Sequence, residues 1–126
     1  MKKIDIPAMG TGAQIWFTIG RLRRLEQVLH MPIKDIAEGM QGLNITYIIA
    51  IMQTGMLQNG LKSEQYYEEK LQQALENGYK MADIYEACIK ALVGSGVLGE
   101  ETYYRLFPEE LTSEAEKNLE GEAAPL

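Results

Sequence analysis

The chain has very few residues of the types that usually carry reactions or bind metals. Among 126 residues there is one cysteine, Cys88, and one histidine, His30. A zinc site needs about four ligands, which these two cannot supply, and no H-x-x-x-H, C-x-x-C or D-x-D-x-D-G spacing occurs. The sequence therefore predicts no catalytic residue, no metal and no cofactor. We expect Cys88 to be a buried, inert thiol and His30 to end a helix, where it complements the helix dipole.

Long hydrophobic runs are also missing. The most apolar stretch, Ile45 to Met52, is eight residues long, whereas a membrane-spanning helix needs about 20. The first residues include Lys2, Lys3 and Asp5 and do not form the apolar core of a secretory signal. A single cysteine fits a reducing compartment. We expect a soluble intracellular protein with no membrane partner.

Positive charge is scarce toward the end of the sequence. The net charge is −6, and from Glu100 onward eight glutamates face only Arg105 and Lys117. Such a chain is a poor electrostatic match for a phosphate backbone. We therefore expect no nucleic-acid partner. Gly10-Thr11-Gly12 lacks the third glycine of a dinucleotide-binding loop and indicates a turn.

What is present is helical periodicity after a short β-prone start. Residues 2–6 and 14–19 are β-prone and flank a loop with one proline and two glycines. Apolar residues at helical spacing then predict helices over about 19–30, 33–40, 45–56, 64–76, 81–92 and 100–106. The expected fold is mainly α: a compact bundle of about five to six short helices with an N-terminal β-hairpin or pair of short strands.

The domain prediction follows from where this periodicity ends. Residues 1–108 are expected to form a single helical domain. Six of the fourteen residues from Glu109 onward are glutamate, and aromatic residues are absent there. Residues 109–126 are therefore expected to be an acidic, largely disordered tail.

Methionine and tyrosine, with seven residues each, are the remaining notable feature. Methionine is common on adaptable binding surfaces and tyrosine is enriched at interfaces. Adjacent tyrosines on one helix cannot both face the same core, so at least one residue of each pair, Tyr66-Tyr67 and Tyr103-Tyr104, should be partly exposed. Irregular filling of the core and a protein-binding or self-association face both remain open. The candidate partner-binding residues are Tyr47, Met52, Met56, Tyr66 and Tyr67.

The order of segments from residue 15 to about 105 resembles a family of small phage and gene-transfer-agent tail proteins. The resemblance is carried by a short strand, Ile15–Ile19, and by the spacings Gly20-x-Leu22-x-x-Leu25-Glu26, Ile33-x-x-Ile36-Ala37, Gly55-Met56-Leu57-x-x-Gly60 and Gly94-Ser95-Gly96-Val97-Leu98. These proteins are described as tail-tube proteins or tail assembly chaperones. The helix expected over 64–76 departs from that pattern.

The resemblance implies a non-enzymatic role in building the tail of a phage or prophage. It implies that the chain binds the tape-measure protein in the bacterial host cytoplasm until tail tube subunits replace it, and that it self-associates. One alternative is a structural, tube-associated tail component, which would be found in the virion. A second is a helix-turn-helix DNA-binding regulator, because residues 33–37 are followed by glycine and a new helix. The candidate recognition helix, however, begins Asn-Ile-Thr-Tyr-Ile and carries no Lys or Arg.

Overall fold

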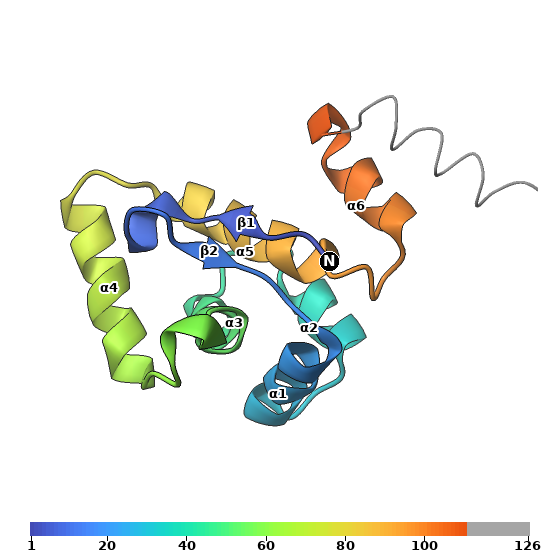
Figure 1. Ribbon diagram of the computed structural model, residues 1–126, viewed down its shortest axis with the longest axis horizontal. Helices are drawn as coiled ribbons and strands as arrows, with labels where there is room; N and C mark the ends of the chain where they lie inside the picture. The colour runs from blue at the N-terminus through green and yellow to red at the C-terminus, as the bar shows by residue number, and fades with distance from the viewer. Residues whose placement is uncertain (111–126) are drawn as a thin grey trace, which may run out of the picture.

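Six α-helices follow a pair of very short strands in the computed structural model, which describes residues 1–110 (Figure 1). The helices are α1 (Ile19–Leu29), α2 (Ile33–Gly39), α3 (Ile45–Gly55), α4 (Glu64–Glu76), α5 (Met81–Val93) and α6 (Glu100–Leu106). The strands are β1 (Ile4–Asp5) and β2 (Gln14–Ile15), and 3-10 turns occur at η1 (Pro7–Met9), η2 (Leu57–Asn59) and η3 (Pro108–Glu110). The mainly helical fold with an N-terminal strand pair is confirmed.

Local chemistry fixes where the helices begin and end. The side chains of Thr18, Asn44 and Ser63 each accept a hydrogen bond from the backbone N–H three residues later, which caps the first turn of α1, α3 and α4. The α1 helix ends at His30, whose backbone is left-handed with φ of 53°. Pro32 directly precedes α2. The expected position of His30 at a helix C-terminus is confirmed.

The strands are shorter than the β-prone runs predicted. Antiparallel pairing joins only Ile4 to Ile15 and Asp5 to Gln14. On one strand the pairing ends because Pro7 starts η1. On the other, the N–H of Trp16 donates to the carbonyl of Gly55 at the end of α3, 3.1 Å away, instead of continuing the ladder.

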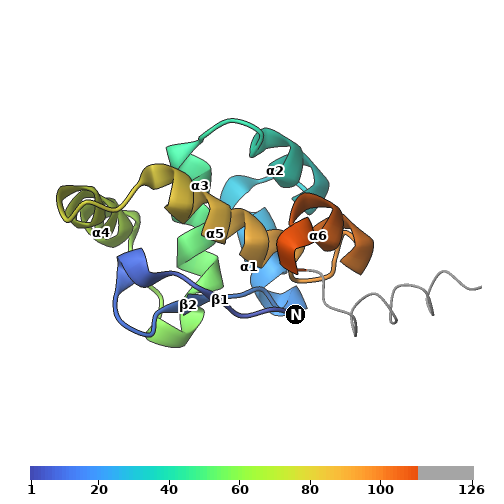
Figure 2. The same ribbon diagram turned by 90° about the horizontal axis from the view of Figure 1, so that it is seen from above.

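The core is built around α3. Ile48, Ile51 and Met52 on this helix have no measurable exposure, and α3 packs against α1, α4 and α5. Figures 1 and 2 show α4 and α6 at opposite ends of the molecule, with α3 and α5 between them. Burial on several faces explains why α3 is the most apolar helix of the chain.

A second, smaller hydrophobic cluster holds α6 against α5. It consists of Val93, Tyr103, Tyr104 and Phe107, and Ile89 packs against both this cluster and the main core. Polar contacts add to it: Lys2 donates from Nζ to the Tyr104 hydroxyl at 2.9 Å, and its backbone N–H donates to the Gly94 carbonyl. The first residues of the chain therefore help to hold its sixth helix.

Tyr103 and Tyr104 are both buried, with exposed fractions of 1% and 8%, so the expectation that one of this pair is exposed is wrong. The reason is that residues from outside α6 cover both rings. Lys2 Nζ lies 4.9 Å from the centroid of the Tyr103 ring and 5.0 Å from that of Tyr104, and Phe107 packs against Tyr103.

The described chain continues two residues past the expected domain end at residue 108. There the carboxylate of Glu110 accepts hydrogen bonds from Lys90 Nζ, at 2.7 Å, and from the Tyr103 hydroxyl. The rest of the predicted acidic tail lies outside the described residues. Within residues 1–110, no helix combines the length and the apolar character that crossing a bilayer would require.

Candidate functional site

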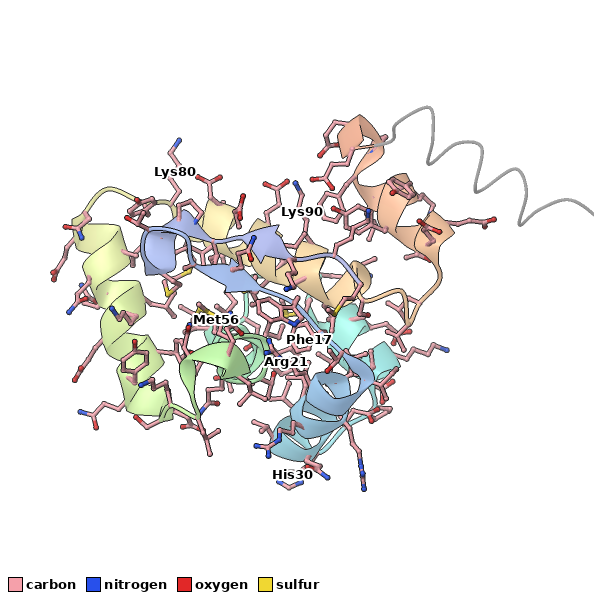
Figure 3. All side chains as sticks on the ribbon, viewed as in Figure 1. Phe17, Arg21, His30, Met56, Lys80 and Lys90 are labelled. Atoms are coloured by element: carbon pink, nitrogen blue, oxygen red, sulfur yellow. The ribbon has the colours of Figure 1, made fainter. Side chains whose placement is uncertain are left out.

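Three of the five predicted partner-binding residues lie in the core. The exposed fractions of Met52, Met56 and Tyr67 are 0%, 2% and 2%, and Figure 3 shows Met56 between α3 and α4. Their side chains present almost no surface to a partner, because α3 is covered by three other helices and α4 turns its apolar side toward it. We therefore correct the assignment of these three residues from partner contact to core.

The other two candidates are partly exposed but lie apart. The Tyr47 hydroxyl donates to Met31 Sδ at 3.3 Å, and its ring lies against Gly39 of α2. Tyr66 is 36% exposed and packs edge-to-face on Tyr67, as expected for adjacent tyrosines of which one is exposed. Met56, Tyr66 and Tyr67 do meet, but the crevice that they line has a volume of only about 20 Å³.

The two most reactive side chain types occupy unremarkable positions. Cys88 is fully buried on α5, as predicted, and burial raises the pKa of its thiol to about 12. His30 is exposed at the end of α1, where Figure 3 shows it at the edge of the molecule. In residues 1–110, no three His, Cys, Asp or Glu side chains are grouped so that they could hold a metal ion.

An apolar concavity that the sequence did not single out lies between α2, α5 and α6. This groove has a volume of about 460 Å³. Its lining is dominated by apolar side chains from all three helices and from the turn before α6: Ala37, Met40, Tyr85, Ile89, Leu92, Val93, Leu98, Leu106 and Phe107. A contiguous apolar hollow on a small protein marks a binding surface.

The groove exists because α6 packs on α5 and not on α2. The α6 helix is held by its own cluster on α5, while α2 packs on α1. Their separation leaves the α5 side chains Ile89 and Leu92 as the floor. Leu106 on the α6 wall is 52% exposed, which is high for a leucine that lines an apolar hollow.

Three charged residues lie at the edge of this groove: Lys34 and Glu38 on α2 and Glu86 on α5. Glu38 makes no ion pair with any residue of 1–110. Glu86 is 3.7 Å from Lys90, but Lys90 makes its closer contact, at 2.7 Å, with Glu110. Two carboxylates with little compensation, one on α2 and one on α5, therefore border the apolar floor.

The helices that form the groove were predicted, but the groove itself was not. The apolar spacing over 84–92 and the short helix expected over 100–106 do not show that α2 packs away from α6. No sequence signal marks Leu106, because its place on the groove wall depends on how α6 packs. Comparison with protein-family models, curated proteins and solved structures found no match.

Proposed function

We propose that this protein is a non-enzymatic tail assembly chaperone of a phage or prophage that binds the tape-measure protein. The observation that carries the proposal is the apolar groove between α2, α5 and α6. The resemblance of residues 15–105 to small tail proteins supplies the identity of the partner. Within this proposal the working part of the molecule is a surface and not a reactive side chain.

The groove suits a reversible holding function. Burying apolar area contributes about 25 cal/mol per Å², and part of this gain is offset by the loss of translational and rotational freedom on association. A groove formed by a few aliphatic and aromatic side chains therefore supports binding that a competing tail tube subunit can displace. Such displacement is what a chaperone of an elongated partner requires.

The proposal is tested by a substitution on the exposed wall of the groove. Leu106→Glu places a charge among apolar side chains, where an unpaired carboxylate is strongly disfavoured. Co-expression with the tape-measure protein of the same phage should give co-purification with the wild-type chain and at least a tenfold loss with Leu106→Glu, equivalent to about 1.4 kcal/mol or more. Because Leu106 is half exposed, we expect the variant to stay folded.

Leu75→Glu is the matched control. Leu75 is 42% exposed on α4, at the end of the molecule opposite α6, and does not line the groove (Figure 1). It should leave co-purification unchanged. Equal loss from both variants, or no binding of the tape-measure protein by the wild-type chain, would refute the proposal.

A structural tail component is the second candidate, and exposed apolar side chains away from the groove favour it. Ile19 at the start of α1 and Leu61 in the loop before α4 are each 74% exposed, and contacts between successive copies would require such separate apolar sites. Under this alternative the purified chain should form rings or tubes visible by electron microscopy and be present in finished particles. A chaperone should remain a small species and be missing from them.

The helix-turn-helix alternative gains no support from the position of α3. This helix would have to read the DNA major groove, yet seven of its eleven residues are buried. If the purified protein shifted the DNA of its own operon in a gel, this result would support the DNA-binding alternative.

A further inference from the structure

We propose that the groove between α2, α5 and α6 accepts a single amphipathic α-helix whose apolar stripe is flanked by Lys or Arg. This inference rests on the proposed function, since it specifies the kind of segment that the groove would take from a partner. It follows from two features of the groove: the secondary structure of its walls and the charges at its edge.

The secondary structure of the groove walls favours a helix over an extended segment as the bound peptide. An extended peptide binds by pairing its backbone with a free strand edge. Here the walls are α2, α5 and α6, whose backbone groups are bonded within their own helices, so they offer no such edge. A peptide entering an apolar groove must bring its backbone hydrogen bonds with it, because unpaired polar groups are strongly disfavoured there. A helix does so, because its backbone groups are bonded within it.

The charged residues at the edge of the groove favour a bound helix that carries basic side chains. Glu38 on α2 and Glu86 on α5 are both exposed and both border the groove. Glu86 competes for Lys90 with Glu110, which holds the closer contact. Lys34, the one cation at the edge, lies a turn before Glu38 on the same wall. A helix with Lys or Arg flanking its apolar stripe would place positive charge beside these carboxylates.

The same charges argue against the chain's own C-terminal sequence as the occupant. Residues 111–126 contain four glutamates and one lysine. Such a segment would bring like charges toward Glu38 and Glu86, which is unfavourable at short range. The separate partner is therefore the better electrostatic match.

The test uses the full chain and three synthetic helical peptides with a fluorescent label. Each is about 18 residues, or five helical turns, long. The first has leucines at helical spacing with lysines flanking them, the second replaces every lysine by glutamate, and the third scrambles the first so that its stripe is lost. Fluorescence anisotropy should show the lysine peptide binding at least about tenfold more tightly than either of the others.

Two double variants locate the binding. Glu38→Gln with Glu86→Gln should weaken the lysine peptide about tenfold, whereas Glu68→Gln with Glu69→Gln should change its affinity less than about twofold. Both doubles alter the net charge equally, and Glu68 and Glu69 are exposed on α4, away from the groove. Any general attraction of a basic peptide to an acidic protein would therefore affect both doubles equally.

Three results would overturn the inference: equal effects of the two doubles, tighter binding of the glutamate peptide, or no advantage of the lysine peptide over its scrambled form. The outcome is separable from that of the proposed function. If the tape-measure protein co-purifies and Leu106→Glu abolishes this, but the peptides show no preference for basic flanks, the function stands and this inference fails. If the lysine peptide binds and the tape-measure protein does not, the function fails and the groove chemistry stands.

Discussion

Gly55 shows how a single residue constrains the packing of this domain. It ends α3 directly beneath the segment that follows β2. A Cβ atom at this position would lie 2.6 Å from Ile15 Cγ1 and 3.0 Å from Phe17 Cζ, and both of these side chains are buried. The Gly55 carbonyl also accepts hydrogen bonds from the Trp16 N–H and from Arg21 Nη1. The backbone here is thus fixed from two sides.

We expect Gly55→Ala to lower the free energy of unfolding by about 1–3 kcal/mol, as overpacking of a filled core does. Urea denaturation followed by circular dichroism measures this. Gly20→Ala is the control, because a Cβ atom on Gly20 of α1 would meet only Thr18 Oγ1, at 3.8 Å. Its stability should be unchanged or slightly raised, since alanine favours the helix. A Gly55→Ala protein as stable as the wild type would show that Ile15 and Phe17 can move aside.

The properties of single residues also explain why most of the predicted binding residues lie in the core. Methionine and tyrosine counts record how much adaptable apolar side chain the sequence contains, and they do not record where it lies. Met52 and Met56 follow the apolar stripe of α3, and Tyr67 that of α4. Leu106, which lines the groove, has no compositional feature that marks it.

At the scale of elements, α6 is a short helix that packs mainly on α5. It spans seven residues, too few for a helix to be stable alone in water. A small aromatic cluster on α5 and the carboxylate of Glu110 hold it in place. Gly96 and Gly99, in the turn before it, have φ of 86° and 91°, which glycine adopts without strain. This wall of the groove therefore depends on specific polar contacts as well as on the aromatic cluster.

We expect Glu110→Gln to increase hydrogen exchange of the α6 amides several-fold while leaving α3 unchanged. The substitution removes the charge that Lys90 binds at 2.7 Å, and local opening depends on such contacts. Exchange read by mass spectrometry on peptides covering 95–110 measures it. Glu86→Gln is the matched control, because Glu86 is 3.7 Å from Lys90 and its side chain is 51% exposed. Similar exchange in both variants would mean that the aromatic cluster alone holds α6.

At the scale of the whole molecule, buried groups in the core are expected to make the free energy of unfolding fall at alkaline pH. Burial raises the pKa of Cys88 from 9.0 to about 12, and burial together with the neighbouring Tyr66 raises the pKa of Tyr67 from 10.0 to about 12. The hydrogen bond to Glu110 is the main cause of the raised pKa of Lys90. In each case the folded chain holds its proton more tightly than the unfolded chain does.

A raised pKa contributes stability that is complete below the unfolded value and is lost as pH rises toward the folded one. Between about pH 9 and pH 12 the unfolded chain loses the Cys88 and Tyr67 protons first. We therefore expect the urea midpoint to be steady from pH 7 to 9 and to fall steeply above it. Cys88→Ala should be less stable at neutral pH yet show a shallower fall. Parallel curves for the two proteins would rule out thiol ionisation as a cause.

The sequence by itself determined the elements. Helical spacing, the capping side chains Thr18, Asn44 and Ser63, and the break before Pro32 act within a few residues, so the helices could be predicted with bounds close to those observed. These are short-range effects of backbone geometry and hydrogen bonding, and they operate without knowledge of the rest of the fold.

Only the tertiary structure decided which apolar faces are covered. The strand pair stops after two residues because Trp16 bonds to the end of α3, far along the chain. The groove is open because α6 packs on α5 and leaves α2 apart. The burial of a helix face depends on which segment, distant in the sequence, packs over it. An apolar stripe has the same spacing whether or not another segment covers it.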